Sequence, residues 1–251
     1  MTTLEGRAFD VFVVALFPEL VAPLFAHSVL GRAAGRGLVR FHPVQIRDFA
    51  VNKHRTVDDT PYGGGSGMVM QCAPVVAALE SLPRDADGEA PLRVLLTPQG
   101  RVFRQAEARS LSTRRSLAVV CGRYEGFDER IRAYVDLELS VGDFVLTGGE
   151  PAAVALLDAV LRLVPGVLGN EASAVQESHG DDGLLEFPQY TRPVDFRGAV
   201  VPAVLSSGDH GRVDRWRRWQ SLRRTRARRP DLFAARALTL RDLAFVDGDE
   251  P

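Results

Sequence analysis

Short apolar runs that end at turns constrain the fold of this chain more than any other feature. The first run, FDVFVVAL at residues 9–16, is rich in β-branched side chains, and further runs lie at 38–46, 93–96 and 117–121. Helical spacing follows the first run over residues 20–32, and the strongest helical pattern covers residues 150–163. Buried strands that alternate with helical segments predict an α/β domain with a mostly parallel sheet.

The character of the chain changes after residue 168. Residues 169–183 are small and polar and have no usable period, which predicts a linker or a mobile loop. Residues 184–251 carry several helical patterns and few strand patterns. We therefore predict an α/β domain at 1–168, a flexible linker at 169–183 and a small helical domain at 184–251.

Positive charge is concentrated in the C-terminal part of the chain. The formal net charge is only −1, but residues 212–229 hold nine arginines and one acid. Arginine pairs with phosphate and stacks on bases, and Trp216 and Trp219 in the same stretch would offer stacking platforms, so this pattern favours contact with nucleic acid. The alternative is a helix whose tryptophans pack inward while its arginines are solvated, and both can hold together.

Several common enzyme classes are excluded by inspection. A nucleotide-binding P-loop needs Gly-Lys-Ser/Thr, and the single lysine, Lys53, follows Asn52. The motifs HExxH and GxSxG are absent, and the five histidines never fall at metal-ligand spacing. No signal peptide opens the chain, and Cys72 and Cys121 form no CxxC pair, so we expect a cytoplasmic protein.

Three glycine-rich turns, at residues 97–100, 122–126 and 142–149, carry the signal for a ligand site. Each follows an apolar run, and an open α/β sheet binds ligands where its strands end. Glycine lets a flat ring approach the backbone closely. Any one of these turns alone is more simply explained as a tight connection, but the three together favour a shared pocket.

The same turns carry a resemblance to a known family. Residues 95–100 (LLTPQG), 121–130 (CGRYEGFDER) and 141–150 (VGDFVLTGGE) resemble the bacterial tRNA (guanine-N1)-methyltransferases of the SPOUT superfamily. Residues 57–68 (VDDTPYGGGSGM), 164–169 (VPGVLG) and 190–193 (YTRP) do so as well, and the match covers nearly the whole chain in order.

The resemblance implies both a fold and a reaction. The fold would be a trefoil-knotted SPOUT domain, with a parallel sheet flanked by helices, followed by a small helical domain that binds tRNA. The reaction would be methyl transfer from S-adenosylmethionine to N1 of guanosine 37 of tRNA, 3′ of the anticodon. The resemblance further implies a homodimer with active sites at the subunit interface. It also suggests dependence on Mg²⁺, although no ligand cluster in the sequence identifies a metal site.

In the family the three turns hold the methyl donor, mostly through backbone contacts. The residues so implicated here are Leu96, Thr97, Pro98, Gly122, Tyr124, Glu125, Val141, Gly142, Phe144, Leu146, Gly148 and Gly149.

Catalysis on guanine N1 requires a base near N1 and a cation near O6, where negative charge develops. The resemblance places the cation at Arg162, for which the alternative is a surface arginine favoured by a helix C-terminus. It places the base at Glu177, where relatives usually carry aspartate. Asp181 and Asp182 are nearby candidates, and a solvated linker carboxylate is the simpler explanation of any of the three.

Two other functions remain open on the sequence alone. One is a SPOUT methyltransferase that acts on ribosomal RNA or on another tRNA base. The other is a non-catalytic RNA-binding protein built around the arginine-rich segment. The helical C-terminal pattern and the YTRP segment favour the guanosine enzyme.

Overall fold

The chain folds into two compact units, Met1–Gly169 and Asn170–Pro251. The computed structural model describes residues 7–169, 177–236 and 238–248. The division falls at the start of the predicted linker, of which residues 170–176 lie outside the described residues. The linker at 169–183 therefore stays a prediction, and each unit is described by itself.

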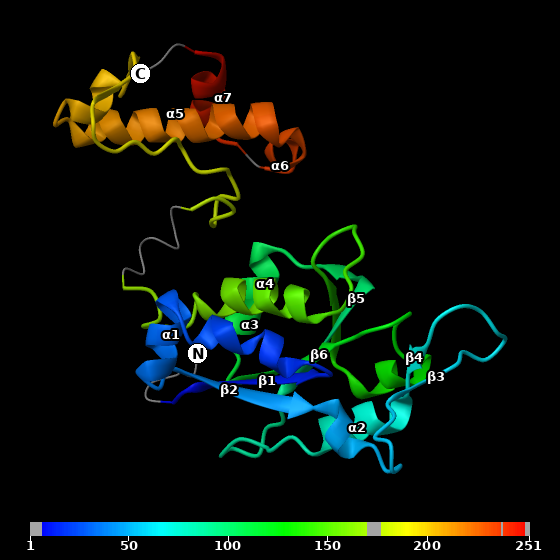
Figure 1. Ribbon diagram of the computed structural model, residues 1–251. Coiled ribbons are helices and arrows are strands. Elements are labelled where there is room, and N and C mark those ends of the chain that lie inside the picture. The colour runs from blue at the N-terminus through cyan, green and yellow to red at the C-terminus, as the bar shows by residue number, and fades with distance from the viewer. Residues whose placement is uncertain (1–6, 170–176, 237, 249–251) are drawn as a thin grey trace. The chain divides into compact units, whose positions relative to one another are not determined.

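A five-stranded parallel sheet forms the centre of the N-terminal unit, in the order β2-β1-β6-β5-β7 (Figure 1). The strands are β1 (Phe9–Ala15), β2 (Val39–Gln45), β5 (Leu92–Val102), β6 (Ser116–Cys121) and β7 (Leu137–Ser140). A small antiparallel pair, β3 (Asp58–Asp59) and β4 (Val69–Met70), flanks the long glycine-rich loop. The predicted α/β class with a parallel sheet is confirmed, and the trefoil knot stays a prediction.

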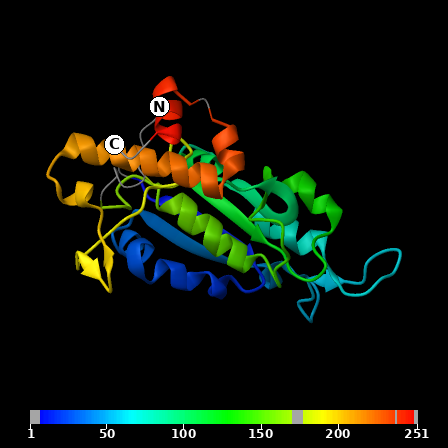
Figure 2. The same ribbon diagram turned by 90° about the horizontal axis from the view of Figure 1, so that it is seen from above.

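Helices cover both faces of this sheet, as Figures 1 and 2 show. The core on one face includes residues of α1 (Ser28–Gly35), α3 (Gln105–Ser112) and α4 (Glu150–Leu161). The core on the other face includes residues of α2 (Cys72–Glu80) and of the 3₁₀ helices η3 (Ile46–Phe49) and η4 (Glu129–Tyr134). Strand β1 serves both cores, because Val13 and Ala15 point to one face and Val14 to the other.

The helix predicted over residues 20–32 is interrupted in the structure. Two 3₁₀ helices, η1 (Pro18–Leu20) and η2 (Ala22–Phe25), occupy most of this range, and α1 begins only at Ser28. Pro23 lies in the first turn of η2. Proline has no backbone N–H and disfavours the helical conformation in the residue before it, so a continuous helix cannot run through this point.

The C-terminal unit is mainly helical, as predicted. It contains η6 (Ala203–Ser206), α5 (His210–Arg228), α6 (Pro230–Ala234) and α7 (Leu240–Asp247), together with a hairpin of β8 (Asp195–Phe196) and β9 (Ala199–Val200). Trp216 is 0% exposed and Trp219 5%, and both pack with Val204 in the core of this unit. The proposal that these tryptophans offer stacking platforms is therefore wrong, because their rings fill the core.

An ion pair fastens α7 to α5. Arg218 Nε lies 2.9 Å from Asp242 Oδ1, and the Thr239 hydroxyl donates to Asp242 Oδ2 at 2.8 Å. The hydrogen bond from Arg218 and those from Thr239 lower the pKa of Asp242 from 3.8 to about 2. A carboxyl group whose pKa is lower in the folded state stabilises that state above its unfolded pKa.

We expect acid to destabilise this unit as the pH falls from about 4 toward 2, because Asp242 then binds a proton and loses Arg218. Asp242→Asn should lower the melting temperature at pH 7 and weaken its dependence on pH below 4. Thermal unfolding followed by circular dichroism from pH 2 to 7 measures both effects. Asp214→Asn, which alters an exposed carboxylate on α5, is the control, and identical pH profiles for Asp242→Asn and wild type would contradict the prediction.

Candidate active site

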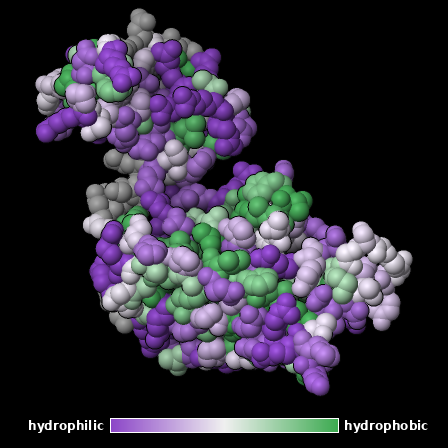
Figure 3. All heavy atoms as spheres, in the orientation of Figure 1, coloured by the Kyte–Doolittle hydropathy of each residue, from purple (hydrophilic) through white to green (hydrophobic). Residues whose placement is uncertain are grey.

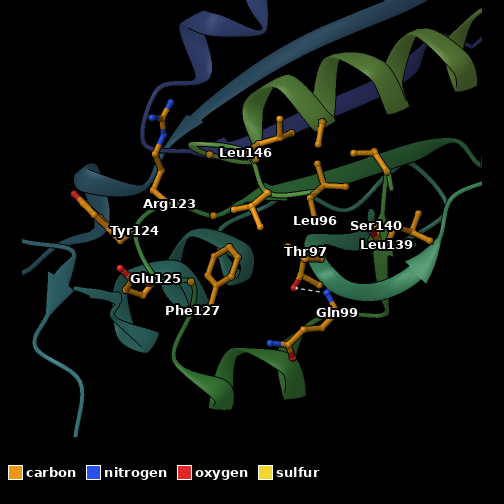
Figure 4. A pocket seen from close by; sticks show the side chains of 18 of the residues that line it. Leu96, Thr97, Gln99, Arg123, Tyr124, Glu125, Phe127, Leu139, Ser140 and Leu146 are labelled. Atoms are coloured by element: carbon orange, nitrogen blue, oxygen red, sulfur yellow. Dashed lines mark hydrogen bonds between the residues drawn. The ribbon is translucent and has the colours of Figure 1, made fainter. Parts of the chain in front are cut away.

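A cavity of about 360 Å³ lies beside residues 96–99 within β5, at the carboxyl ends of β6 and β7 and at the start of α4 (Figure 4). Residues from all three predicted turns line it, including Leu96, Gly122 and Gly149. The carboxyl ends of parallel strands leave backbone groups exposed in a crevice, which is where open α/β sheets bind ligands. The shared pocket expected from the glycine-rich turns is present.

All twelve residues expected to contact the methyl donor line this one cavity. The structure adds further lining residues: Gln99, Arg123, Gly126, Phe127, Glu129, Arg132, Leu139, Ser140, Val145, Thr147 and Ala152. Most of these lie inside or beside the same turns, so the turns themselves were the available signal. Arg132 had no such signal, because it reaches the cavity from η4.

The first turn departs from its prediction. Residues 97–100 do not end the strand but lie within β5, whose pairing with β7 shifts register between Leu96 and Arg101. A Cβ atom on Gly100 would lie 2.5 Å from the backbone nitrogen of Leu139, so only glycine lets the two strands approach here. The unpaired stretch leaves Thr97 and Pro98 at the cavity wall.

The second turn has a left-handed backbone and is fastened to β4. Tyr124 has a φ of 61° and Gly126 one of 118°, and the Glu125 N–H donates to the Met68 carbonyl at 3.0 Å. An added Cβ on Gly67 would collide with the Glu125 side chain, so the glycine-rich loop before β4 lies against this turn. Tyr124 is 47% exposed, which leaves its ring accessible beside the cavity.

The third turn is joined to the second. The Gly149 N–H donates to the Gly122 carbonyl at 2.8 Å, and the Ser140 hydroxyl donates to the Gly142 carbonyl at 3.0 Å. Phe144, Val145 and Leu146 from this turn are exposed. The backbones of the second and third turns are therefore hydrogen-bonded to each other beside the cavity, while the third turn carries exposed apolar side chains.

A polar cluster closes the side of the cavity near η4. Arg132 donates to the Gln99 amide oxygen at 2.7 Å and pairs with Glu129 at 2.8 Å. It also pairs with Glu138 of β7. Deeper in, burial raises the pKa of the Cys121 thiol well above its usual value, with a smaller contribution from Glu150, so this cysteine stays a neutral core residue.

Neither of the two predicted catalytic residues is among the residues that line this cavity. Arg162 is the C-cap of α4, whereas the cavity lies at the N-terminal end of that helix, roughly 20 Å away at 1.5 Å per residue. Glu177 belongs to the C-terminal unit and lines a second cavity of about 270 Å³ with Arg217 and Arg218. Asp182 lines the same second cavity. The roles of Arg162 and Glu177 stay predictions.

The described residues contain neither a cluster of metal-ligating side chains nor a membrane-spanning helix. Among them no group of three or more histidine, cysteine, aspartate or glutamate side chains is arranged to hold a metal ion. No helix in the described ranges is long and apolar enough to span a bilayer.

Known proteins resemble this chain over nearly its full length. The family described as tRNA (Guanine-1)-methyltransferase TrmD matches residues 9–235. A protein of Anaeromyxobacter sp. (strain Fw109-5) called tRNA (guanine-N(1)-)-methyltransferase is 53% identical over 243 residues, which cover 96% of this chain and 97% of the relative.

Proteins of the same name from other bacteria agree with this match. That of Myxococcus xanthus is 53% identical, covering 93% of this chain and 94% of its own. That of Desulforudis audaxviator is 55% identical, covering 89% of each chain. The resemblance inferred from the glycine-rich motifs is confirmed. The chain belongs to the tRNA (guanine-1)-methyltransferase TrmD family.

Proposed function

We propose that this protein transfers a methyl group from S-adenosylmethionine to N1 of guanosine 37 of tRNA. The observation that carries the proposal is the convergence of all twelve expected donor-binding residues on one cavity, in a chain at least half identical to enzymes named for this reaction. These relatives support neither a ribosomal RNA enzyme nor a non-catalytic RNA-binding protein. A tRNA substrate supports a cytoplasmic location.

The cavity suits a compact donor that carries a flat base. Its volume of about 360 Å³ is within the range of small-ligand sites. A Cβ added to Gly122 would lie 2.5 Å from the Phe127 ring, and one added to Gly142 would lie 2.5 Å from the Phe144 ring. Glycine at both positions therefore lets an aromatic ring lie directly against the backbone, and the donor can pack on these two rings.

Glu177 and Arg162 are the proposed catalytic residues. The Glu177 carboxylate accepts the N1 proton of guanine, and the N1 electron pair then attacks the donor's methyl carbon. The bond between that carbon and sulfur breaks, and its electrons leave on sulfur, which becomes a neutral thioether. Arg162 offsets the negative charge that gathers on guanine O6. Dependence on Mg²⁺ stays a prediction from the family resemblance.

Arg162 lies far from the donor cavity of its own chain. A homodimer would explain how it can still act in catalysis. If the active site lies between subunits, the arginine of one chain serves the cavity of the other. The cavity rim carries three exposed apolar side chains, those of Phe144, Val145 and Leu146. Exposed apolar surface of this kind is typical of protein–protein interfaces. Figure 3 shows hydrophobic patches among polar ones on the visible face of the N-terminal unit.

The arginines of α5 are proposed to contact tRNA phosphates. Arg212, Arg215, Arg223, Arg226 and Arg228 are exposed, while the two tryptophans point into the core. We expect tRNA affinity to fall about tenfold or more between 50 and 200 mM salt, even if only two phosphates are neutralised. Filter binding over a salt series measures this slope.

The double variant Arg215→Gln/Arg228→Gln should reduce the salt slope by about two. Arg40→Gln on β2 of the other unit is the matched control and should leave it unchanged. A flat salt response of the wild-type protein would rule out this surface as the principal contact.

Methyl transfer from labelled S-adenosylmethionine to unmodified bacterial tRNA tests the function as a whole. We expect incorporation into tRNA with guanosine at position 37 and none into a tRNA that differs only at this nucleotide. Equal labelling of both tRNAs would point to a different target base. Labelling of ribosomal RNA in preference to tRNA would favour the other enzyme class.

A further inference from the structure

An ion pair between a buried carboxylate and a partly buried arginine joins two walls of the donor cavity. Glu150, the first residue of α4, has a side chain that is 0% exposed, and its Oε1 accepts a hydrogen bond from Arg123 Nε at 3.3 Å. Its Oε2 lies 3.2 Å from the same nitrogen but has no hydrogen-bond partner among the described residues. The carboxylate at the N-terminus of a helix also benefits from the helix dipole.

Arg123 is held on its other side by an aromatic ring. Its guanidinium carbon lies 4.8 Å from the centre of the Phe17 ring, in the segment after β1. In Figure 4 the Arg123 side chain points away from Phe127. The backbone of Arg123 nevertheless lies between Gly122 and Tyr124, both of which line the cavity. The side chain is thus placed to act on the cavity wall rather than on the donor.

The local sequence is compatible with this pair only because Gly148 lacks a side chain. A Cβ at Gly148 would lie 2.6 Å from Arg123 Nε and 2.7 Å from Glu150 Oε2. The adjacent hydrogen bond from Gly149 to Gly122 runs between the same two turns. The contacts of Arg123 with the two Glu150 oxygens and the hydrogen bond from Gly149 to Gly122 therefore fix the distance between the turn at 122–126 and the turn at 142–149, which leads into α4.

We propose that Arg123 and Glu150 are positioning residues, which hold these two turns at the separation that S-adenosylmethionine requires and so set its affinity. This inference rests on the proposed function of the cavity. A buried ion pair contributes little net stability compared with apolar side chains of the same size, because both charges lose their hydration. The pair is better suited to defining one geometry of the turns than to stabilising the fold.

Isothermal titration calorimetry of the purified full-length protein with S-adenosylmethionine tests the proposal. Arg123→Gln and Glu150→Gln should each raise the donor Kd about 10- to 100-fold, as expected for a displacement of the turn by up to about 1 Å. Arg123→Lys keeps the charge and should recover most of the affinity. Arg40→Gln removes an exposed arginine that pairs with Asp10 at 2.9 Å, and it should bind the donor as the wild type does.

The fitted number of sites separates positioning from a purely structural role. A role in folding alone would lower the number of competent sites and leave the Kd of the remaining protein unchanged, which would overturn the proposal. An equal loss of affinity in Arg40→Gln would overturn it as well. If Arg123→Gln does not fold, the donor Kd of Glu150→Gln tests the proposal. Glutamine keeps the shape of the glutamate side chain and leaves Arg123 on the Phe17 ring.

The same titration distinguishes failure of this inference from failure of the proposed function. Wild-type protein that does not bind S-adenosylmethionine would contradict the function. Wild-type protein that binds it, together with glutamine variants whose Kd stays within about twofold, would contradict only the role of the pair.

Discussion

Replacing Glu177 with glutamine should lower the rate of methyl transfer by about 10²- to 10⁴-fold, the usual contribution of a general base. Glutamine keeps the size of the side chain but cannot accept the N1 proton. Donor binding should be unaffected, because Glu177 belongs to the C-terminal unit and does not line the donor cavity. Single-turnover methyl transfer at saturating tRNA measures the rate, and calorimetry measures donor affinity.

Neighbouring carboxylates provide the controls for this result. Asp181→Asn and Asp182→Asn alter the same segment, and each should retain most of the wild-type rate. Glu177→Asp shortens the side chain by one methylene to the residue usual in the family, and we expect it to remain active. Near-normal turnover of Glu177→Gln would show that another residue is the base. Loss of turnover in Asp181→Asn or Asp182→Asn would identify that aspartate as the base.

A single methyl group at Gly149 should abolish donor binding within the measurable range, with a Kd raised about 100-fold or more. The Cβ of Gly149→Ala would lie 2.7 Å from Cys121 Cα and 2.9 Å from the Gly122 nitrogen. Both contacts are with backbone, so the turns must separate and the hydrogen bond from Gly149 to Gly122 must lengthen. Calorimetry with S-adenosylmethionine gives the Kd directly.

Gly35→Ala is the matched control for this substitution. Gly35 lies at the end of α1, and an added Cβ there meets nothing within 4 Å. Its donor affinity and melting temperature should equal those of the wild type or improve slightly, since alanine favours helix. Donor binding by Gly149→Ala that matches Gly35→Ala would mean that the two turns tolerate separation, contrary to the geometry described above.

The parts of the fold that local sequence determines were predictable. Apolar β-branched runs marked β1, β2 and β6, and the pattern at 150–163 marked α4. Helix α2 was not predicted, because its nine residues, CAPVVAALE, form a short apolar run that periodicity alone cannot distinguish from a buried strand. The pairing of β1 with β6 joins residues far apart in the chain, and no local pattern reports such a contact.

Some features of the candidate site could be predicted from the sequence, and others could not. Glycine spacing indicated a shared pocket, but the assignment of individual donor-binding residues came from the resemblance. The Arg123–Glu150 pair had no signal in the sequence, since its members are 27 positions apart and one lies in a turn while the other begins α4. The sequence also left open where Trp216 and Trp219 point, because an arginine-rich helix can turn its aromatic side chains either way.

The order of strands has a consequence for how the protein is made. β1 pairs with β2 and with β6, and β6 leaves the ribosome about 100 residues after β1, or roughly 5 to 20 s later at typical rates of synthesis. During that interval one hydrogen-bonding edge of β1, an apolar strand that is later central in the sheet, has no native partner. Such edges promote aggregation, so the nascent chain should depend on chaperones more than its modest length suggests.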